Sequence, residues 1–507
     1  MLSKIISCAL NGIDGYIVEV QIDISNGFPG FSLVGLPDSA VKESIERVRA
    51  AIKNSNFEFP AKKITVNLAP ADTKKEGPSF DLPIALGILS CMGYIEQKSI
   101  ENTMICGELS LDGSIRSVNG ILPMVCSLKN NNNISKFIIP YENRKEAALI
   151  ENTKIYPVKT LEELIEHLNN KKIISPYKND KNIFSDNNEI LDFSDVIGQE
   201  SVKRAIEISA SGYHNILLSG PPGSGKTMLA KRIPSILPDL TFDESIEITK
   251  IYSVAGLLKN KNSLIVKRPF RSPHHTISAS ALTGGGRIPK PGEISLASGG
   301  VLFLDELPEF PRNVLEIMRQ PLEDGKVTIS RVSGTVTYPA KFMLVAAMNP
   351  CPCGYLGDER CHCTLNEIAK YKNKISGPLI DRIDINIETP AVKYSDLECS
   401  TPQETSAEIK KRVVAAHKIQ IKRYKKENIY FNSQLNATQI KKYCVLGSEE
   451  NKLLKVAFER MNLSARAYHK ILKVARTIAD LEGCKNINTK HLAEAIQYRN
   501  IDRNYNL

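Results

Sequence analysis

The chain of 507 residues has no apolar segment long enough to cross a membrane. Its longest uncharged apolar stretch near a predicted core segment, Leu82–Ile95, is well short of the roughly 20 residues that a membrane helix needs. The start of the sequence also lacks the apolar region of a signal peptide, because Asn11 and Asp14 follow soon after Lys4. We therefore expect no membrane contact and a cytoplasmic location.

Cysteine is infrequent as well, and 11 cysteines in a chain of this length exclude a small disulfide-stapled scaffold. Hydrophobic residues make up 42% and charged residues 24% of the chain, which is too apolar for a disordered protein. We find no internal repeat at the periods of solenoid proteins. At about 150 residues per domain, the length predicts about three domains.

Positive charge is concentrated at one end of the chain. Residues 400–507 hold 21 Lys and Arg against 10 Asp and Glu, whereas residues 1–168 hold 17 against 20. Residues 169–399 are nearly balanced, with 28 against 26. Such asymmetry is typical of a protein with a polyanionic partner, although a solvated basic surface would give the same count.

The residue patterns divide the chain into three parts and a linker. Residues 1–168 alternate strand and helix patterns, including a strand with period-2 alternation over Tyr16–Ile24. Residues 169–195 collect Asn, Lys, Asp and Ser with little periodicity and are interpreted as a linker. Residues 196–395 mix strands, Gly-rich loops and helices, and residues 396–507 are almost wholly helical.

A phosphate-binding loop follows the apolar run Asn215–Ser219, which reads as a buried strand, and precedes a helix pattern. Glycines allow backbone N–H groups to surround a phosphate, Lys226 places a charge between the β- and γ-phosphates, and the Thr227 hydroxyl ligates Mg²⁺. The predicted ATP-binding residues are Gly220, Pro221, Pro222, Gly223, Ser224, Gly225, Lys226 and Thr227.

Two further apolar runs end in polar residues. Val301–Leu304 leads to Asp305, predicted to hold Mg²⁺, and to Glu306, predicted to orient and deprotonate the attacking water. A third apolar strand ends at Asn349, which could polarise the same water or contact the γ-phosphate. An ordinary turn residue at the end of a strand is the alternative for Asn349.

Arg382 lies among acidic residues in a short predicted helix. An arginine at this place suits a finger that stabilises γ-phosphate charge in a neighbouring subunit. An ion pair with an aspartate of the same chain is the alternative.

In this order, the phosphate loop, Leu304-Asp305-Glu306, Ala347-Met348-Asn349 and the segment 379–382 resemble an AAA+ ATPase. The segments 268–276, 284–296 and 307–310 are more specific. They resemble the magnesium-chelatase-like branch and, within it, the ComM/YifB family, and the resemblance covers essentially the whole chain.

The resemblance implies an α/β protein with three parts. These are a Lon-protease-like α+β domain over residues 1–168, an AAA+ parallel-sheet core over 196–395 and a helical C-terminal lid over 396–507. ComM proteins act as hexameric helicases that branch-migrate DNA during natural transformation. The resemblance therefore implies ATP and Mg²⁺ as cofactors, forked or branched DNA bound without sequence preference, and a homo-oligomer, expected to be a hexamer.

Single residues also match positions of the family. Arg382 matches the arginine finger, Asn349 matches sensor 1, and Arg466 matches the lid arginine that reaches the phosphates of the same subunit's nucleotide. Two β-branched runs around a Ser-Gly turn predict a hairpin, which resembles a hairpin that faces the central pore of related ring motors. Lys326 and Arg331 on this hairpin are DNA-contact candidates, and a solvated hairpin edge is the alternative.

The N-terminal domain departs from Lon in one catalytic residue. Ser79 matches the nucleophilic serine, but the region that should supply its lysine, Val118–Met124, has no basic residue. A serine hydroxyl without a base stays protonated and weakly nucleophilic at neutral pH. We therefore predict no peptidase activity and a structural role for Ser79.

Four cysteines lie close together directly after Asn349. Four soft thiolates within thirteen residues suit a tetrahedral Zn²⁺ ion, with His362 as an alternative ligand. Two reducible disulfides or a turn without metal are the other interpretations. His274 and His275 have no second ligand pair and are interpreted as interface or pore-loop residues. The predicted zinc ligands are Cys351, Cys353, Cys361 and Cys363.

The segment 410–426 packs eight basic residues into seventeen positions without an acid. Contacts of such residues with phosphates would be independent of sequence and sensitive to salt, as a translocating motor requires. A solvated helix is the alternative. The DNA-contact candidates in this segment are Lys410, Lys411, Lys422 and Arg423.

We therefore predict an ATP-driven, ring-forming DNA motor. The main alternative is a magnesium-chelatase-type ATPase subunit that acts on a protein or on a metal-insertion partner. We expect that subunit type to lack the Lon-like domain and the cysteine cluster. A non-enzymatic scaffold conflicts with the intact Lys226, Asp305 and Glu306, and a protease conflicts with the missing lysine.

Overall fold

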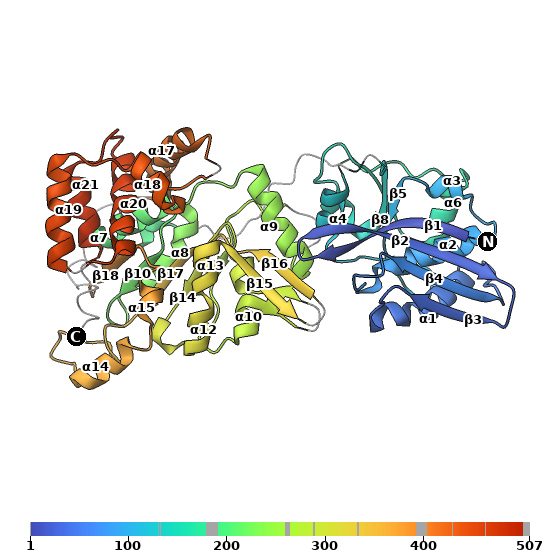
Figure 1. Cartoon of the computed structure of the whole chain (residues 1–507), viewed down its shortest axis with the longest axis horizontal. Coiled ribbons are helices and arrows are strands. Elements are labelled where there is room, and N and C mark those ends of the chain that lie inside the picture. The colour runs from blue at the N-terminus through green and yellow to red at the C-terminus, as the bar shows by residue number, and fades with distance from the viewer. Residues whose placement is uncertain are drawn as a thin grey trace.

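The computed structural model describes residues 2–129, 131, 133–178, 191–258, 264–286, 289–331, 334–391, 403–427, 429–461 and 463–499. Figure 1 shows an elongated molecule with three groups of elements in a row. Residues 2–168 form one end, the sheet of residues 216–388 lies in the middle, and helices of residues 406–497 form the other end. The predicted linker, 169–195, is described over 169–178 and 191–195, and its residues 179–190 lie outside the described residues.

The N-terminal part is built on a mixed seven-stranded sheet with strand order β3-β4-β2-β1-β5-β8-β9. β1, β2 and β4 pair antiparallel, and the other neighbours pair parallel. The sheet strands are β1 (Leu2–Asn11), β2 (Asp14–Ser25), β3 (Gly30–Val34), β4 (Lys63–Ala69), β5 (Thr103–Ile105), β8 (Lys136–Pro140) and β9 (Lys154–Val158). The remaining elements are α1 (Ser39–Asn54), η1 (Pro78–Phe80), α2 (Asp81–Cys91), α3 (Gln97–Ile100), β6 (Glu108–Leu109), β7 (Ile115–Arg116), α4 (Ile121–Leu128), η2 (Tyr141–Asn143), α5 (Arg144–Ala147) and α6 (Leu161–Leu168).

The long apolar stretch of the sequence is the central helix of this part. Every residue of α2 is buried, and α2 contacts β1, β2 and α1. A helix that is apolar on all sides belongs to a core when it is this short. No helix in the described part of the chain combines the length and the apolar character needed to span a membrane.

The middle part contains a five-stranded sheet with order β11-β14-β17-β10-β18, in which all neighbours pair parallel. Its strands are β11 (Phe270–Arg271), β14 (Val301–Leu304), β17 (Met343–Met348), β10 (Ile216–Ser219) and β18 (Ile385–Glu388). Around it lie η3 (Phe193–Asp195), α7 (Glu200–Gly212), α8 (Lys226–Ile236), α9 (Phe242–Ala255), α10 (Ala279–Thr283), β12 (Gly284–Gly285), β13 (Lys290–Pro291), α11 (Glu293–Leu296), η5 (Leu307–Glu309), α12 (Arg312–Ile317), α13 (Arg319–Asp324), β15 (Lys326–Arg331), β16 (Gly334–Pro339), α14 (Leu365–Lys372) and α15 (Gly377–Ile380).

Continuous apolar runs give this sheet its strands. β10, β14 and β17 are buried along their whole length, as strands of a parallel sheet covered on both faces are. The strands predicted at Asn215–Ser219, at Val301–Leu304 and before Asn349 are therefore confirmed. Because parallel strands end at the same edge, the polar residues that follow them meet there.

β15 and β16 form the predicted hairpin as a separate two-stranded ribbon. The turn between β1 and β2 lies against it, since a Cβ on Gly12 would come within 3.0 Å of the Val336 Cγ1 atom. α4 contacts α9, and the Ser253 hydroxyl of α9 donates a hydrogen bond to Glu146. The N-terminal part is thus packed on the middle part through α9 and the hairpin.

The C-terminal part is helical, as predicted. Its elements are α17 (Ser406–Tyr424), η6 (Asn432–Gln434), α18 (Ala437–Tyr443), α19 (Ser448–Met461), α20 (Ala465–Leu481) and α21 (Thr489–Gln497). α17 begins with a capping box in which Thr405 and Glu408 satisfy each other's backbone N–H groups. It packs on α7, α8 and α20, so that this part shares a hydrophobic core with the sheet.

Candidate nucleotide-binding site

The predicted phosphate loop joins β10 to α8 at the carboxyl edge of the parallel sheet. Gly223 and Gly225 have φ angles of 75° and 80°, which L-residues adopt only with strain. A Cβ on Gly220 would lie 2.2 Å from the Thr389 carbonyl oxygen, so this position also requires glycine. No side chain caps the first turn of α8, which leaves its N–H groups free for an anion.

Lys226 turns its ammonium group into this loop. Its Nζ atom donates to the carbonyl oxygens of Gly220 at 2.7 Å and Pro221 at 2.9 Å, and it lies 3.3 Å from the Asn349 Oδ1 atom. Burial lowers the pKa of Lys226, and the charges of Asp305 and Glu306 oppose that shift. A partly desolvated cation beside free N–H groups is suited to bind phosphate oxygens.

The predicted magnesium ligands lie together although they are far apart in the sequence. The Thr227 hydroxyl donates to the Asp305 Oδ2 atom at 2.6 Å. A hydroxyl oxygen and a carboxylate oxygen in contact are hard ligands of the kind that Mg²⁺ prefers. The donor set at this edge therefore fits a magnesium ion bound together with a phosphate.

Glu306 stands next to this pair in an unusual conformation. Its φ angle of 51° lies in the left-handed region, which non-glycine residues occupy mainly where the surrounding structure imposes it. The carboxylate is exposed, and its Oε2 atom lies 3.4 Å from the His275 Nδ1 atom. The sequence suggests an interface or pore-loop role for His275, and the structure places this residue beside Glu306.

Gln199 is a second neighbour of the loop that the sequence does not reveal. Its side-chain nitrogen donates to the Ser224 carbonyl oxygen at 2.7 Å and reaches the Pro390 carbonyl oxygen at 3.5 Å. The residue has a φ angle of 58° and directly precedes α7. The only signal in the sequence is its place after Gly198 at the start of a helix pattern.

Arg382 and Arg466 lie at the opposite edge of the sheet. The Asn215 amide donates to the Arg382 carbonyl oxygen at 3.0 Å, and Asn215 precedes β10, whereas the phosphate loop follows it. The four residues of β10 span about 13 Å at ~3.3 Å each. Arg382 therefore cannot reach the phosphate loop of its own chain.

Both arginines meet one carboxylate at this edge. The Arg382 guanidinium donates to the Glu323 Oε2 atom, and the Arg466 Nη2 atom lies 4.0 Å from the Glu323 Oε1 atom. The expectation that Arg466 reaches the nucleotide of the same subunit is corrected by this geometry, because α20 packs at the edge that carries Arg382. The ion-pair partner of Arg382 in this chain is Glu323, not a neighbouring aspartate.

The hairpin residue Lys326 is exposed at the start of β15, directly after α13, the helix that carries Glu323. The side chain of Arg331 lies outside the described part of the structure, although its backbone pairs with Gly334. Val327 and Ile329 point into the core, so buried side chains alternate with exposed ones along β15.

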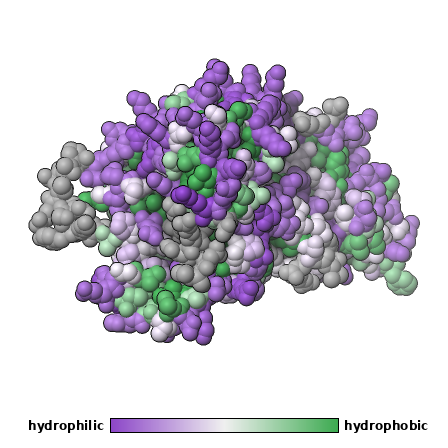
Figure 2. All heavy atoms as spheres, turned by 60° about the vertical axis from the view of Figure 1, so that its left-hand side comes forward, coloured by the Kyte–Doolittle hydropathy of each residue, from purple (hydrophilic) through white to green (hydrophobic). Residues whose placement is uncertain are grey.

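The basic segment is divided between bound and exposed side chains. The Lys410 Nζ atom lies 2.6 Å from the Asp239 Oδ1 atom, whereas Lys411 and Lys422 are exposed. Figure 2 shows that the surface at the helical end of the molecule is largely hydrophilic, interrupted by small hydrophobic patches. Lys411 and Lys422 are the candidates whose positions agree with a contact to an external anion.

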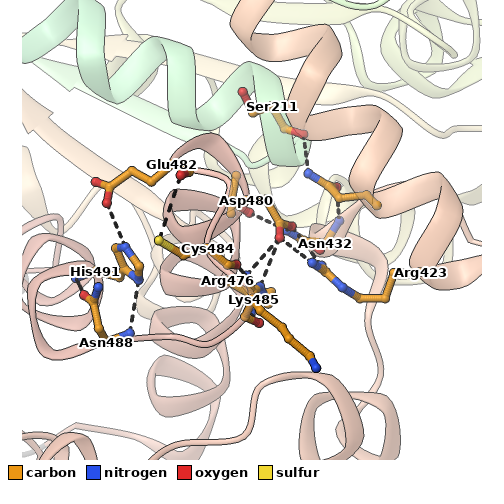
Figure 3. Close-up of polar contacts among 12 residues, drawn as sticks. Ser211, Arg423, Asn432, Arg476, Asp480, Glu482, Cys484, Lys485, Asn488 and His491 are labelled. Atoms are coloured by element: carbon orange, nitrogen blue, oxygen red, sulfur yellow. Dashed lines mark hydrogen bonds and ion pairs between the residues drawn. The ribbon is translucent and has the colours of Figure 1, made fainter.

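Arg423 is the exception, and its prediction as a DNA contact is corrected. Its guanidinium donates twice to the buried carboxylate of Asp480, once at 2.8 Å. Asn432 and Arg476 donate to the same carboxylate at 2.9 Å and 3.2 Å (Figure 3). Arg423 thus joins α17 to α20 inside the fold.

In the N-terminal part, Ser79 lies buried in η1, where its carbonyl oxygen accepts a hydrogen bond from the Gly107 N–H group. The region that would supply the catalytic lysine of a Lon protease forms α4, whose Leu122 N–H group donates to Glu146 at 3.0 Å. The buried face of α4 is apolar. α4 packs against α9, so this region serves packing between the N-terminal and middle parts.

Two groups of side chains in the described ranges could hold a metal ion. One is the predicted cysteine cluster. The other joins Glu482, Cys484 and His491 (Figure 3). In it the His491 Nδ1 atom accepts from the Asn488 N–H group, so the neutral ring carries its proton on Nε2, which donates to Glu482 at 2.9 Å. No ring nitrogen is then left for a metal.

A parallel sheet with a phosphate loop after β10, an asparagine after the neighbouring β17 and two acids after β14, all at the same edge, defines a P-loop fold of the AAA+ magnesium-chelatase type. Family models agree with this class. One described as "Magnesium chelatase, subunit ChlI" matches residues 192–397, and its C-terminal counterpart matches 403–499. A third, "Subunit ChlI of Mg-chelatase", matches residues 20–143. We expected the N-terminal domain to argue against a magnesium-chelatase subunit, and this match shows that by itself it does not.

Full-length relatives narrow the class. The chain is 43% identical over 504 residues to competence protein ComM of Haemophilus influenzae, covering 98% of this chain and 97% of the relative. It is 42% identical over 503 residues to the uncharacterized protein YifB of Escherichia coli, covering 99% and 98%. A shorter match, 30% identical over 132 residues, relates 26% of the chain to 23% of Lon protease 2 of Bacillus subtilis. The chain belongs to the ComM/YifB family of magnesium-chelatase-like proteins.

Proposed function

We propose that this protein is an ATP-hydrolysing, ring-forming motor that moves branched DNA. The observation that carries the proposal is the meeting of Lys226, Thr227, Asp305 and Asn349 at one sheet edge, although they follow three separate strands. The sequence similarity to a competence protein supports DNA as the partner. We infer a cytoplasmic location for such a motor.

The loop residues perform binding and orientation. The N–H groups of residues 223–227 surround the β-phosphate, and the Lys226 ammonium exchanges its carbonyl partners for phosphate oxygens. Thr227 and Asp305 would hold a magnesium ion, which would supply positive charge against the charge that develops on the phosphates. Glu306 accepts a proton from the attacking water, and Asn349 holds that water through its amide. The left-handed conformation of Glu306 aims the carboxylate out of the strand.

The second half of the site comes from another subunit. Arg382 and Arg466 lie about one strand length from their own phosphate loop, so they can serve only a nucleotide on a neighbouring chain. Both arginines then face the γ-phosphate of the neighbouring chain's nucleotide, and they give up their ion pairs with Glu323 to do so. Head-to-tail contacts of this kind close into rings, and we propose a hexamer.

DNA lies against the hairpin and the exposed basic residues. Lys326 and Arg331 from each subunit line the pore, and Lys411 and Lys422 contact phosphates outside it. Contacts with phosphates alone carry no sequence information, which lets the motor pass any base. Lys410 must leave its ion pair with Asp239 before it can contact a DNA phosphate.

We assign the four predicted regions to this motor. Residues 1–168 form a Lon-like domain without peptidase activity, 169–195 a linker, 196–395 the ATPase core and 396–507 the helical lid. The packing of α4 on α9 supports a role of the Lon-like domain in holding the core.

The test is an ATPase and branch-migration assay with the full chain. We expect four-way or forked DNA to stimulate hydrolysis, and we expect ATP to drive movement of the branch point. The Glu306→Gln variant should keep nucleotide binding and ring assembly but lose at least ~100-fold in turnover. ATPase activity without stimulation by DNA and without branch migration would favour the magnesium-chelatase alternative. Normal turnover by Glu306→Gln would refute the assignment of the base.

A further inference from the structure

The four clustered cysteines lie around one common point. Their ligand atoms are all within 4.8 Å of one another. The Cys351 sulfur lies 3.3 Å from that of Cys353 and 3.9 Å from that of Cys361, and the last two are 3.7 Å apart. Zinc–thiolate bonds of ~2.3 Å place the sulfurs of a tetrahedral site about 3.8 Å from one another.

The arrangement differs from what two disulfides require. A disulfide pairs each sulfur with one partner at ~2.05 Å. Here the Cys353 sulfur has two sulfur neighbours at similar distances, and all four thiols are free. The Cys353 N–H group also donates to the Cys363 sulfur at 3.4 Å, an outer-shell contact that stabilises a metal-bound thiolate.

The backbone around the cluster is shaped as two short turns. The Gly354 N–H group donates to the Cys351 carbonyl oxygen at 3.0 Å, and the Cys361 N–H group donates to the Asp358 carbonyl oxygen at 2.9 Å. Gly354 and Gly357 have φ angles of 87° and 89°. These turns bring the first and the second cysteine pair to one place without a long loop between them.

The first turn also contacts the nucleotide site. A Cβ on Gly354 would lie 2.5 Å from the Pro222 Cδ atom and 3.8 Å from the Asn349 Cγ atom, so the Gly354 backbone rests on the phosphate loop. Asn349, two residues before Cys351, contacts Lys226. An ion that fixes Cys351 and Cys353 would therefore hold both Asn349 and Pro222 in place.

We propose that these four cysteines bind one zinc ion, and that the ion braces the phosphate loop and the Asn349 side chain. The bracing role rests on the proposed nucleotide site, whereas zinc binding does not. Soft thiolates select zinc over the magnesium that the oxygen ligands of the neighbouring site would hold. Loss of the ion should free the turn and weaken nucleotide binding about 10-fold.

The experiment measures zinc and nucleotide separately on the full chain. Protein purified under reducing, oxygen-free conditions is titrated with Zn²⁺, and bound metal is counted after removal of free ions. Substitution with Co²⁺ reports the ligand set, because a tetrahedral thiolate site gives intense visible absorption. The affinity for a fluorescent ADP analogue is then measured, without DNA and without hydrolysis. The double variant Cys361→Ser/Cys363→Ser is compared with Cys484→Ser, whose thiol lies outside the cluster.

We expect one zinc per chain in the wild type and in Cys484→Ser, and none in the double variant, which should bind the ADP analogue about 10-fold more weakly. Chelation of zinc from the wild type should reproduce that loss, which covers the case in which the double variant does not fold. Well under one zinc per chain after titration would overturn the site. Unchanged ADP affinity after zinc removal would overturn the bracing role. A failure of the motor proposal would show instead in the DNA assays, with zinc binding intact.

Discussion

The most direct test of the basic segment compares two adjacent residues of α17. Arg423 donates two hydrogen bonds to the buried Asp480 carboxylate, whereas Lys422 is exposed. Arg423→Gln removes the charge that faces this carboxylate. Lys422→Gln removes an equal charge from the surface and serves as the matched control.

The expected loss of stability follows from the partners that remain. Leaving a buried charge without its partner costs about 3–5 kcal/mol. Asp480 keeps Arg476 at 3.0 Å and the Asn432 amide at 2.9 Å, so compensation is partial. We therefore expect a loss of about 2–4 kcal/mol for Arg423→Gln and under ~0.5 kcal/mol for Lys422→Gln.

Hydrogen exchange measured on peptides of α20 reports this loss locally, because it does not require the whole chain to unfold in one step. Binding of four-way DNA at several salt concentrations is the second measurement. Lys422→Gln should weaken binding and reduce the slope of log affinity against log salt, by about one for each phosphate that Lys422 neutralises. If Arg423→Gln left α20 protection unchanged and weakened DNA binding instead, our structural interpretation of Arg423 would be refuted.

Three further predictions concern other parts of the chain. Glu323→Gln removes the carboxylate that competes for Arg382, so nucleotide-dependent assembly should reach its midpoint at a several-fold lower protein concentration in analytical ultracentrifugation; an unchanged midpoint would argue against the competition. Burial lowers the pKa of His417 to about 4, whereas an unfolded histidine titrates near 6.5, so the unfolded state gains the proton first and stability falls as pH drops from about 6.5 to 4. His417→Phe, which keeps the stack on Phe431, should remove about 2 kcal/mol of the loss between pH 7 and pH 5 in urea titrations followed by circular dichroism, and an equal loss in both proteins would contradict this. Ser79→Ala should leave ATPase activity unchanged, and casein digestion should be absent from both proteins; turnover that Ser79→Ala abolishes would disprove the missing-base argument.

Much of the nucleotide site could be predicted because its information is local. An apolar run followed by a polar residue identifies a strand end, and parallel pairing then brings separate strand ends to one edge. Thr227 and Asp305 are 78 positions apart in the sequence, yet their side chains lie within hydrogen-bond distance. The hairpin was predictable for a similar reason, since two β-branched runs around a Ser-Gly turn leave one register.

Residues whose placement depends on packing between distant helices were not predictable. The charge of Arg423 looks free in the sequence because its partner lies 57 positions away on α20. The position of Arg466 depends on which edge of the sheet α20 covers, and no spacing in the sequence encodes that choice. Nothing in the sequence connects His275 or Gln199 with the nucleotide site, since neither belongs to a strand end or to the glycine-rich loop.

Under the proposed function, the two edges of the parallel sheet explain why one chain would hold only part of the site. β10 and β18 run parallel, so the loop after β10 and the arginine before β18 must lie at opposite edges. The phosphate loop and Arg382 are held at opposite ends of these two strands. No side-chain movement can bring them together, because an arginine side chain is shorter than β10. On the proposed assembly, the carboxyl edge of one chain faces the amino edge of the next, and hydrolysis requires both. Glu323 then has two states, with both arginines on it in the single chain and with none when a neighbour's phosphate binds them. Because Glu323 lies in α13, immediately before Lys326 and β15, a change of its partners acts at the base of the hairpin that we assign to the pore.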